Sequence, residues 1–316
     1  MLLELKDDIE ILLVDDCTPD DSMEIAMQVL EEYPHRKDQV HVIHHERNMG
    51  IAATKKDGYL YAVGEYVVVV DGDDYLDRRY AELMYNKGVE ENADIVVCAF
   101  YDQYVSGQVL YSVGVPSKKK FDDNIRKDII NRVMTPCLWH KIIRKSIVHN
   151  PGILWPQGGL GEDTVLCPMF AYYAKQVAYI SEPLYYYMIH PSSVSRIETK
   201  TAEQIDSLYA SFKNNVDILI RFFEKEQVSD TYQLGIFINK LRAKNRVRYQ
   251  IGKRKYRKLW FDTYPEINKV LLCGSPYYKP SMRSYLWLLA LTLGLPANKK
   301  LYKYVLKCVP SCKGVI

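Results

Sequence analysis

The stretch Glu65-Tyr-Val-Val-Val-Val-Asp-Gly-Asp-Asp74 decides the fold, because a run of valines ends abruptly in three carboxylates. Residues 67–70 predict a strand that is buried on both faces. Asp71, Asp73 and Asp74 then lie at the carboxyl end of that strand, where open α/β sheets bind their ligands. Clustered carboxylates favour a hard cation, Mg²⁺ or Mn²⁺, usually shared with the phosphates of a ligand. A polar turn that caps the next helix is the structural alternative.

The residues upstream repeat this design. Asp8-Ile-Glu-Ile-Leu-Leu-Val-Asp-Asp16 is a second apolar segment that ends in paired acids, and apolar residues recur at helical spacing from Ser22. A short strand over residues 41–44 and a helix over residues 51–63 then lead into the valine run. The order β-α-β-α-β predicts a parallel sheet with right-handed crossovers.

Composition indicates a globular protein of 316 residues, with 48% hydrophobic and 26% charged residues. Neither disorder nor an integral membrane protein fits these values. The seven cysteines form no C-x-x-C pair, and no signal peptide is recognisable. We therefore expect reduced thiols and a cytoplasmic location.

Four motifs in the first quarter of the chain resemble the nucleotide-sugar half of the inverting family 2 glycosyltransferases, which have the A-type fold. They are Val14-Asp-Asp-Cys-Thr-Pro-Asp-Asp-Ser22, Asn48-Met-Gly-Ile-Ala-Ala-Thr-Lys55, Gly64-Glu-Tyr66 and Asp71-Gly-Asp-Asp-Tyr-Leu76. The resemblance continues through Gly161-Glu-Asp163 and a segment from Leu184 to Ser195. It covers roughly the first two-thirds of the chain and fades beyond residue 200.

The resemblance implies an α/β fold with a mainly parallel, Rossmann-like sheet flanked by helices. The catalytic domain would span residues 1–200, with a nucleotide-sugar half at 1–100 and an acceptor half at 101–200. Residues 201–316 would form a helical C-terminal extension. Family members open with a strand and a helix that precede the segment matching residues 9–14. Here the chain begins with Met1-Leu-Leu-Glu-Leu-Lys6, so we expect the first strand to be absent and apolar edge groups to be exposed.

The resemblance also assigns residues to the nucleotide. Asp15 and Asp16 would contact the nucleotide, with Asp15 accepting a hydrogen bond from its base, while Asn48 and Gly50 would shape the loop beneath it. Gly50 would allow close approach of the backbone. Lys55 stands where the family usually has arginine, and one ammonium cannot make a bidentate contact. Cys17 replaces a glycine that is common after the paired acids.

A divalent cation is implied at the end of the valine run. Asp73 would carry Mn²⁺ or Mg²⁺, and Asp71 would lie near the ribose and the metal. Residues 1–100 contain 23 acidic and 9 basic residues, so a diphosphate needs a cation to bind there. His190 follows an alternating, strand-like segment and is a candidate third ligand; a hydrogen-bonded structural histidine is the alternative.

The general base is expected in the glycine-rich loop Gln157-Gly-Gly-Leu-Gly-Glu-Asp163, which opens a helix. The resemblance makes Asp163 the base and gives Glu162 a role in acceptor orientation. Acids in the first turn of a helix also complement its dipole, which is the structural explanation. Trp139 precedes this loop, where core packing is the default and stacking on a sugar is the alternative.

These assignments predict an inverting hexosyltransferase. It would move a sugar from a nucleotide diphosphate donor, most plausibly linked to UDP, to a glycan or lipid-linked acceptor in bacterial cell-surface polysaccharide synthesis. Three alternatives remain: a nucleotidyltransferase, an impaired or truncated relative that acts as a membrane-docked binding protein, and a phosphatase-like or other metal hydrolase. The last is the weakest, because the sequence lacks clustered histidine ligands. Release of nucleoside diphosphate rather than pyrophosphate separates transferase from nucleotidyltransferase.

The C-terminal part of the chain is basic. Residues 240–258 contain ten basic residues in nineteen, and residues 285–295 form a short apolar segment that includes a tryptophan. Together they fit peripheral attachment to an anionic membrane at the inner face of the plasma membrane. A helix that packs on the catalytic domain with a solvated basic face is the alternative. Nothing resembles a nucleic-acid-binding fold.

Overall fold

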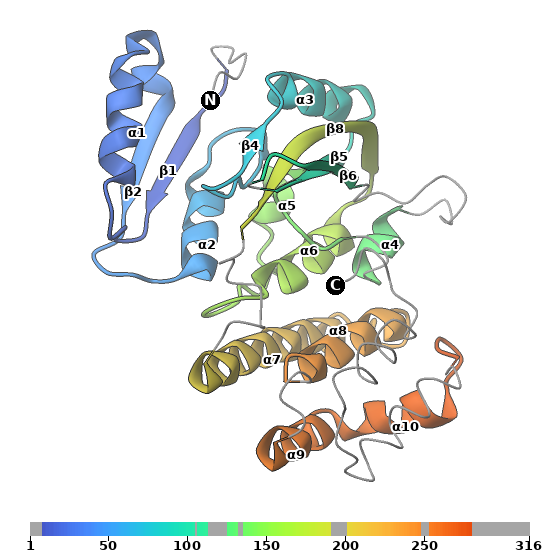
Figure 1. The fold of residues 1–316 in the computed structure, drawn as a ribbon. Helices are drawn as coiled ribbons and strands as arrows, with labels where there is room; N and C mark the ends of the chain where they lie inside the picture. The colour runs from blue at the N-terminus through green and yellow to red at the C-terminus, as the bar shows by residue number, and fades with distance from the viewer. Residues whose placement is uncertain are drawn as a thin grey trace. The chain divides into compact units, whose positions relative to one another are not determined.

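The computed structural model describes residues 8–104, 106–112, 125–131, 135–190, 201–247 and 253–279. The chain forms two compact units (Figure 1). The first consists of residues 1–126 and 136–190, and the second of residues 127–135 and 191–316. Helix α4 (Ile125–Ile130) runs across the junction. The sequence places the end of the catalytic domain at about residue 200, and no sequence signal marks residues 127–135 as part of the second unit.

The first unit opens with a small parallel sheet. Its two strands are β1 (Ile11–Asp15) and β2 (Val40–His44). The helix α1 (Ser22–Glu31) and the 3₁₀ turn η1 (Pro34–Gln39) connect them. Strands β1 and β2 pair in parallel, with Ile11 opposite Val40 and Asp15 opposite His44. The predicted β-α-β order is therefore confirmed here, and it brings the paired acids after β1 beside the histidines that end β2.

A second, six-stranded sheet forms the centre of the unit. Its order is β3-β7-β5-β8-β4, and β6 pairs with β5. The strands are β3 (Tyr66–Val67), β4 (Tyr75–Leu76), β5 (Ile95–Tyr104), β6 (Val109–Ser112), β7 (Lys141–Arg144) and β8 (Val177–Ile189). Within this sheet, only β5 and β8 run parallel, and its other described pairings are antiparallel. The prediction of a mainly parallel sheet is wrong, and the sheet is mixed.

The valine run departs furthest from its prediction. The strand ends at Val67, because β3 meets β7 over two residue pairs only, Tyr66 with Arg144 and Val67 with Ile143. Among the described residues, β3 does not pair with β1 or β2. Val68 and Val70 instead pack as partly buried side chains against the hydrophobic core. Burial, rather than sheet pairing, explains the apolar character of this segment.

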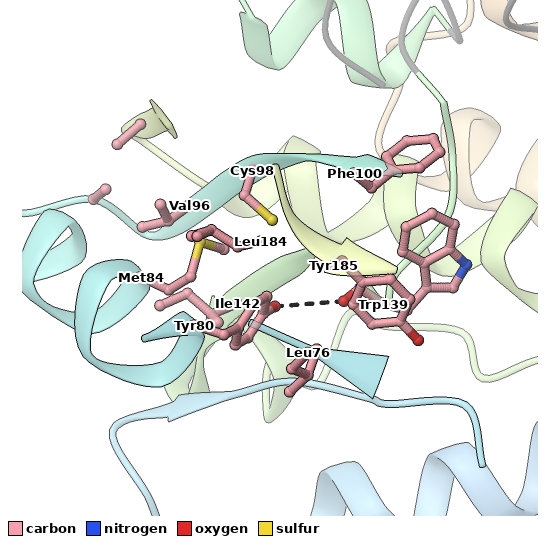
Figure 2. Close-up of a cluster of buried hydrophobic side chains, with 12 residues drawn as sticks. Leu76, Tyr80, Met84, Val96, Cys98, Phe100, Trp139, Ile142, Leu184 and Tyr185 are labelled. Atoms are coloured by element: carbon pink, nitrogen blue, oxygen red, sulfur yellow. Dashed lines mark hydrogen bonds between the residues drawn. The ribbon is translucent and has the colours of Figure 1, made fainter. Parts of the chain in front are cut away.

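The core of the first unit lies between the sheet and α3 (Tyr80–Glu90). Val96, Cys98 and Phe100 alternate along β5 and point into this cluster (Figure 2). Figure 1 shows α5 (Lys145–Val148) and α6 (Glu162–Tyr173) on the opposite face of the sheet. Trp139 is 4% exposed and stacks on Tyr185 with 4.4 Å between ring centroids, so it is a core residue.

The described part of the second unit is helical. Its long helix α7 (Ala202–Lys225) begins with a capping box at Thr201 and Gln204. It is followed by α8 (Gln233–Asn245), α9 (Arg254–Asp262) and α10 (Pro265–Cys273). A core that includes Phe237 and Trp260 joins these helices.

The basic run contributes several cations to contacts within this unit. Lys244 is fully buried, Lys240 Nζ lies 2.7 Å from Glu266 Oε1, and Lys255 Nζ lies 2.5 Å from Asp206 Oδ2. Lys240 and Lys244 thus take part in contacts within the unit, whereas Lys255 is 65% exposed, and the solvated basic face stays a prediction. The apolar segment at residues 285–295 and residues 191–200 lie outside the described residues. None of the described helices is long and apolar enough to cross a membrane.

Candidate active site

The carboxylates that follow the valine run have separate environments. Tyr185 of β8 holds the loop: its hydroxyl accepts a hydrogen bond from the Asp71 N–H (3.3 Å) and donates one to Asp74 Oδ2 (2.6 Å). The Met188 N–H donates to Asp74 Oδ1 at 2.7 Å. Burial raises the pKa of Asp74 to about 6, against the opposing effect of these hydrogen bonds. Asp74 therefore anchors the loop to β8.

Tyr185 is a site residue that sequence reasoning missed. It is one of 26 tyrosines and one of three in succession, so composition and spacing do not distinguish it. Its role depends on the pairing of β8 with β4, in which Tyr185 lies opposite Leu76.

Asp73 and His190 approach each other across this loop. The Asp73 side chain is 62% exposed, and its Oδ2 lies 4.0 Å from His190 Nε2. That nitrogen is buried and has no hydrogen-bond partner among the described residues. An exposed carboxylate beside an unpartnered imidazole nitrogen is a donor pair that fits Mn²⁺ or Mg²⁺, provided that ligand oxygens complete the coordination.

The third predicted metal ligand, Asp71, faces elsewhere. Its Oδ1 lies 3.7 Å from Lys55 Nζ. Burial raises the pKa of Asp71, and Lys55 opposes that effect. Within the described ranges, no three His, Cys, Asp or Glu side chains converge on a metal-binding point. Asp73 and His190 are thus brought together, and Asp71 is directed to a lysine instead.

Lys55, on α2 (Ile51–Tyr61), is buried at the centre of the site. Its ammonium donates to Glu162 Oε1 at 2.7 Å and to Asp163 Oδ1 at 3.1 Å. Burial by itself would lower the pKa of Lys55, but Asp163, Glu162 and Asp71 outweigh it and raise the pKa well above its ordinary value. The Lys55 ammonium thus connects α2 with Glu162, which lies 107 positions further along the chain.

The acidic pair opens helix α6. Gly161 is the N-cap residue with φ of 103°, a conformation that glycine adopts without strain. Asp163 Oδ2 accepts a long hydrogen bond from the Leu138 N–H (3.4 Å), and its side chain remains 19% exposed. The Glu162 side chain is buried, and burial followed by the charge of Asp163 raises its pKa. Asp163 is the more accessible of the two acids.

Asp16 holds the loop that precedes α2. Its carboxylate accepts hydrogen bonds from the N–H groups of Met49 (2.6 Å) and Gly50 (2.8 Å), and Asn48 Nδ2 donates to its carbonyl oxygen at 3.2 Å. His45 Nδ1 lies 2.7 Å from Asp16 as well. The predicted nucleotide residues Asp16, Asn48 and Gly50 are thus brought together, with Asp16 engaged in holding the loop.

His45 is a second residue that sequence reasoning missed. Its ring lies between Asp16 and Asp57, with Nε2 3.0 Å from the carboxylate of Asp57 on α2. The hydrogen bond with Asp16 raises the pKa of His45, and Asp57 adds to this effect against burial. The sequence gives only a weak signal for these contacts: His45 directly follows β2, the next strand in the chain after the paired acids Asp15 and Asp16.

Backbone conformation explains two small residues near the nucleotide loop. Gly50 has φ of 84°, and a Cβ built there meets no atom within 4 Å. Within the protein itself, the requirement at Gly50 is therefore the positive φ, and close approach of its backbone to a nucleotide stays a prediction. Cys17 also has a positive φ, 56°, in the left-handed region that glycine adopts most readily.

Asp15 lies beside this loop, and its side chain is 16% exposed. It accepts hydrogen bonds from the Thr18 N–H at 2.9 Å and contacts His44 Nδ1 at 3.0 Å. The Thr18 N–H, followed by His44, lowers the pKa of Asp15. Asp15 is therefore ionised at neutral pH, and its place beside the Asp16 loop fits the predicted contact with a base.

Comparison with known proteins supports the same reading of the sequence. Residues 2–148 match the family model described as glycosyl transferase family 2. EpsH of Bacillus subtilis (strain 168) is 30% identical over 209 residues, which are 64% of this chain and 59% of EpsH. The poly(ribitol-phosphate) beta-glucosyltransferase of Bacillus spizizenii is 28% identical over 187 residues, 58% of this chain and 28% of that protein. The chain thus spans less than two-thirds of these relatives.

Among solved structures, residues 1–349 of S. aureus TarS in complex with UDP match with a TM-score of 0.53. The match covers 92% of this chain and 80% of the TarS chain at 17% sequence identity. At this level of sequence identity, the structural match shows a shared fold alone.

Proposed function

Because this chain belongs to glycosyl transferase family 2, we propose that it transfers a sugar from a UDP-linked donor to an acceptor hydroxyl with inversion at the anomeric carbon. One observation carries the proposal. Asp71 of the donor loop and the Glu162–Asp163 pair of the acceptor loop meet at the ammonium of Lys55. In a single-displacement reaction the donor and the acceptor have to bind next to each other. The shared contact with Lys55 brings the donor loop and the acceptor loop together in this way.

Asp163 is the proposed general base. As the acceptor oxygen attacks the anomeric carbon, its proton passes to the Asp163 carboxylate, and the bond to the diphosphate oxygen breaks on the opposite face. The carboxylate is partly exposed and oriented by Lys55 and the Leu138 N–H, so it is accessible and fixed. Glu162 is buried behind it, and its proposed role in acceptor orientation would act through the shape of the loop.

A divalent cation is the proposed cofactor, as is typical of enzymes with the A-type fold. Asp73 and His190 would hold it, and when bound it would stabilise negative charge on the leaving diphosphate as a Lewis acid. Asp71 is assigned to the ribose and to the edge of this site. The loop held by Asp16, with Asn48 and Gly50, would lie beneath the nucleotide, and Asp15 would face its base.

The proposed acceptor is a glycan or lipid-linked polymer of the bacterial cell surface. Support for the acceptor comes from the beta-glucosyltransferase relative, whose name includes poly(ribitol-phosphate). TarS, which was crystallised with UDP, supports the UDP-linked donor. We place the protein in the cytoplasm, with the basic C-terminal region as its contact to an anionic membrane surface. The internal pairing of Lys240, Lys244 and Lys255 leaves fewer cations for such a contact.

The reaction class is tested with a panel of UDP-sugars in the presence of Mn²⁺. A cognate donor should raise the melting temperature by mass action and should release UDP on incubation with acceptor glycans. Release of pyrophosphate instead would identify a nucleotidyltransferase. Stabilisation by UDP-sugars without turnover would favour a binding protein.

Two variants test the site. Asp163→Asn preserves shape and removes the base, so it should bind UDP normally and lose about 10²–10⁴-fold in kcat. A native rate in this variant would place the base elsewhere. Asp73→Ala should abolish the Mn²⁺ dependence of UDP binding, and unchanged affinity would refute the metal assignment.

A further inference from the structure

The ammonium of Lys55 is committed to carboxylates. A lysine ammonium has three N–H donors. Two of them reach Glu162 Oε1 and Asp163 Oδ1, and Asp71 Oδ1 lies 3.7 Å from the same nitrogen. The Lys55 side chain is 6% exposed, so a nucleotide phosphate would have to displace one of these carboxylates to bind it.

Asp163 needs a partner of this kind. Glu162 and Asp163 are adjacent acids, and two negative charges in a shared, partly desolvated place repel each other. The cation between them offsets that repulsion. Lys55 also holds Oδ1 from the side of α2, while the Leu138 N–H reaches Oδ2 from the segment before β7. The carboxylate plane is therefore held from two elements and retains lone pairs for an acceptor proton.

We propose that Lys55 is a positioning residue for the base Asp163, whose carboxylate it orients toward the acceptor hydroxyl, and that it does not bind the nucleotide. The inference rests on the proposed function, in which Asp163 accepts the proton of the acceptor hydroxyl. Because the same ammonium lies beside Asp71, one cation also fixes the spacing between the donor loop and the base.

Kinetic coupling tests this inference. The rate of UDP release from the UDP-sugar selected by the donor panel is measured at saturating donor, and UDP binding is measured separately with Mn²⁺. Lys55→Met should lower kcat by about 10²-fold, within the range of a general base, and leave the Kd of UDP within about twofold. Lys56→Met, on the same helix, is the matched control and should retain kcat.

The double variant separates a positioning role from an independent one. If Lys55 acts through Asp163, then Lys55→Met combined with Asp163→Asn should be no slower than Asp163→Asn alone. Lys55→Arg keeps the positive charge and should recover part of kcat. A multiplicative loss in the double variant, or a tenfold weaker Kd of UDP with native kcat in Lys55→Met, would overturn the proposal.

Folding is controlled with a charge-matched pair. Lys55→Met leaves buried carboxylates without a cation, whereas Lys55→Met with Glu162→Gln keeps the net charge of the cluster. This pair should fold, bind UDP and show the same low kcat, and a native kcat in it would overturn the proposal. If Asp163→Asn itself turns over at the native rate, the base assignment fails first; a slow Asp163→Asn with a fast Lys55→Met refutes only the role of Lys55.

Discussion

Among the described residues, Lys55 and Lys141 of the first unit and Lys244 of the second are buried, and the partners of Lys55 and Lys244 differ in charge. In the first unit, Lys55 meets three carboxylates. In the second, Lys244 donates to the carbonyl oxygens of Trp260 (2.6 Å) and Thr263, and its ammonium lies 4.3 Å from the centroid of the Trp260 ring. Both ammonium groups have hydrogen-bond partners, but only one has opposite charge beside it.

The consequence is an opposite shift in pKa. Burial lowers the pKa of Lys244 to about 8, and the more distant acids Glu266 and Asp262 offset little of that effect. Burial acts on Lys55 in the same direction, yet its three carboxylates raise its pKa well above the ordinary value. Hydrogen bonds to neutral oxygens satisfy the donors of a buried ammonium without compensating for its charge. This contrast separates an electrostatic centre from a structural tie between α8 and α9.

Removal of the carboxylate-paired lysine should have the largest effect on stability. Lys55→Met leaves uncompensated carboxylates in a buried place, and breaking such a pair typically costs about 3–5 kcal/mol. Hydrogen exchange of peptides from α2 and α6 measures the local loss of stability in the first unit. The matched control is Lys56→Met, and equal protection in both variants would show that the Lys55 contacts contribute little.

The carbonyl-paired lysine should matter less at neutral pH. Lys244→Met leaves the carbonyls of Trp260 and Thr263 without this donor, at a cost of about 1–3 kcal/mol, but it also removes a desolvated charge. We expect a net change smaller than that of Lys55→Met, measured by exchange of peptides from α8 and α9. A loss equal to that of Lys55→Met would show that the identity of the partner is unimportant.

The pH dependence sharpens the same contrast. Between about pH 8 and its ordinary value of 10.5, Lys244 is deprotonated in the folded protein and protonated in the unfolded chain. The unfolded state then binds more protons, so stability rises with pH in this range. Tyr264, whose pKa is raised by burial and by Asp217, acts in the opposite sense from about pH 10.

The measurable window is therefore pH 8–10. At each pH, exchange protection of α8 and α9 is compared between the native protein and Lys244→Met. The exchange protection of the native protein should increase relative to that of the variant as the pH rises. A constant difference across the window would contradict the depressed pKa of Lys244, while Lys55, with its raised pKa, should contribute no slope there.

The smallest effect is expected from an exposed pair. Lys255 contacts Asp206 at 2.5 Å, but its side chain is 65% exposed, so water screens the attraction. Lys255→Met should leave the melting temperature unchanged within measurement error. A clear decrease would mean that pairing alone, without burial, determines the contribution of these lysines.

Individual residues show how far sequence reasoning extended. The family resemblance is confirmed, and the motifs located the Asp16 loop, the acids at 71 and 73 and the pair at 162 and 163. Their proposed roles stay predictions. Tyr185, which holds the acidic loop, gave no signal, because its importance depends on the strand that lies beside it. The valine run predicted a longer strand than the one observed, since apolar composition reports burial but not pairing.

By itself, the sequence determined local features of this protein: the β-α-β start and the acids in the first turn of α6. Such features depend on neighbours along the chain, so motif and periodicity contain them. Only the tertiary structure decided that the sheet is mixed and that Lys55 meets Glu162, 107 residues away. It also decided that Lys244 is buried while Lys255 is exposed, although both belong to one basic run. Charge in a sequence is a property of a residue, whereas its energetic effect depends on the groups that folding places around it.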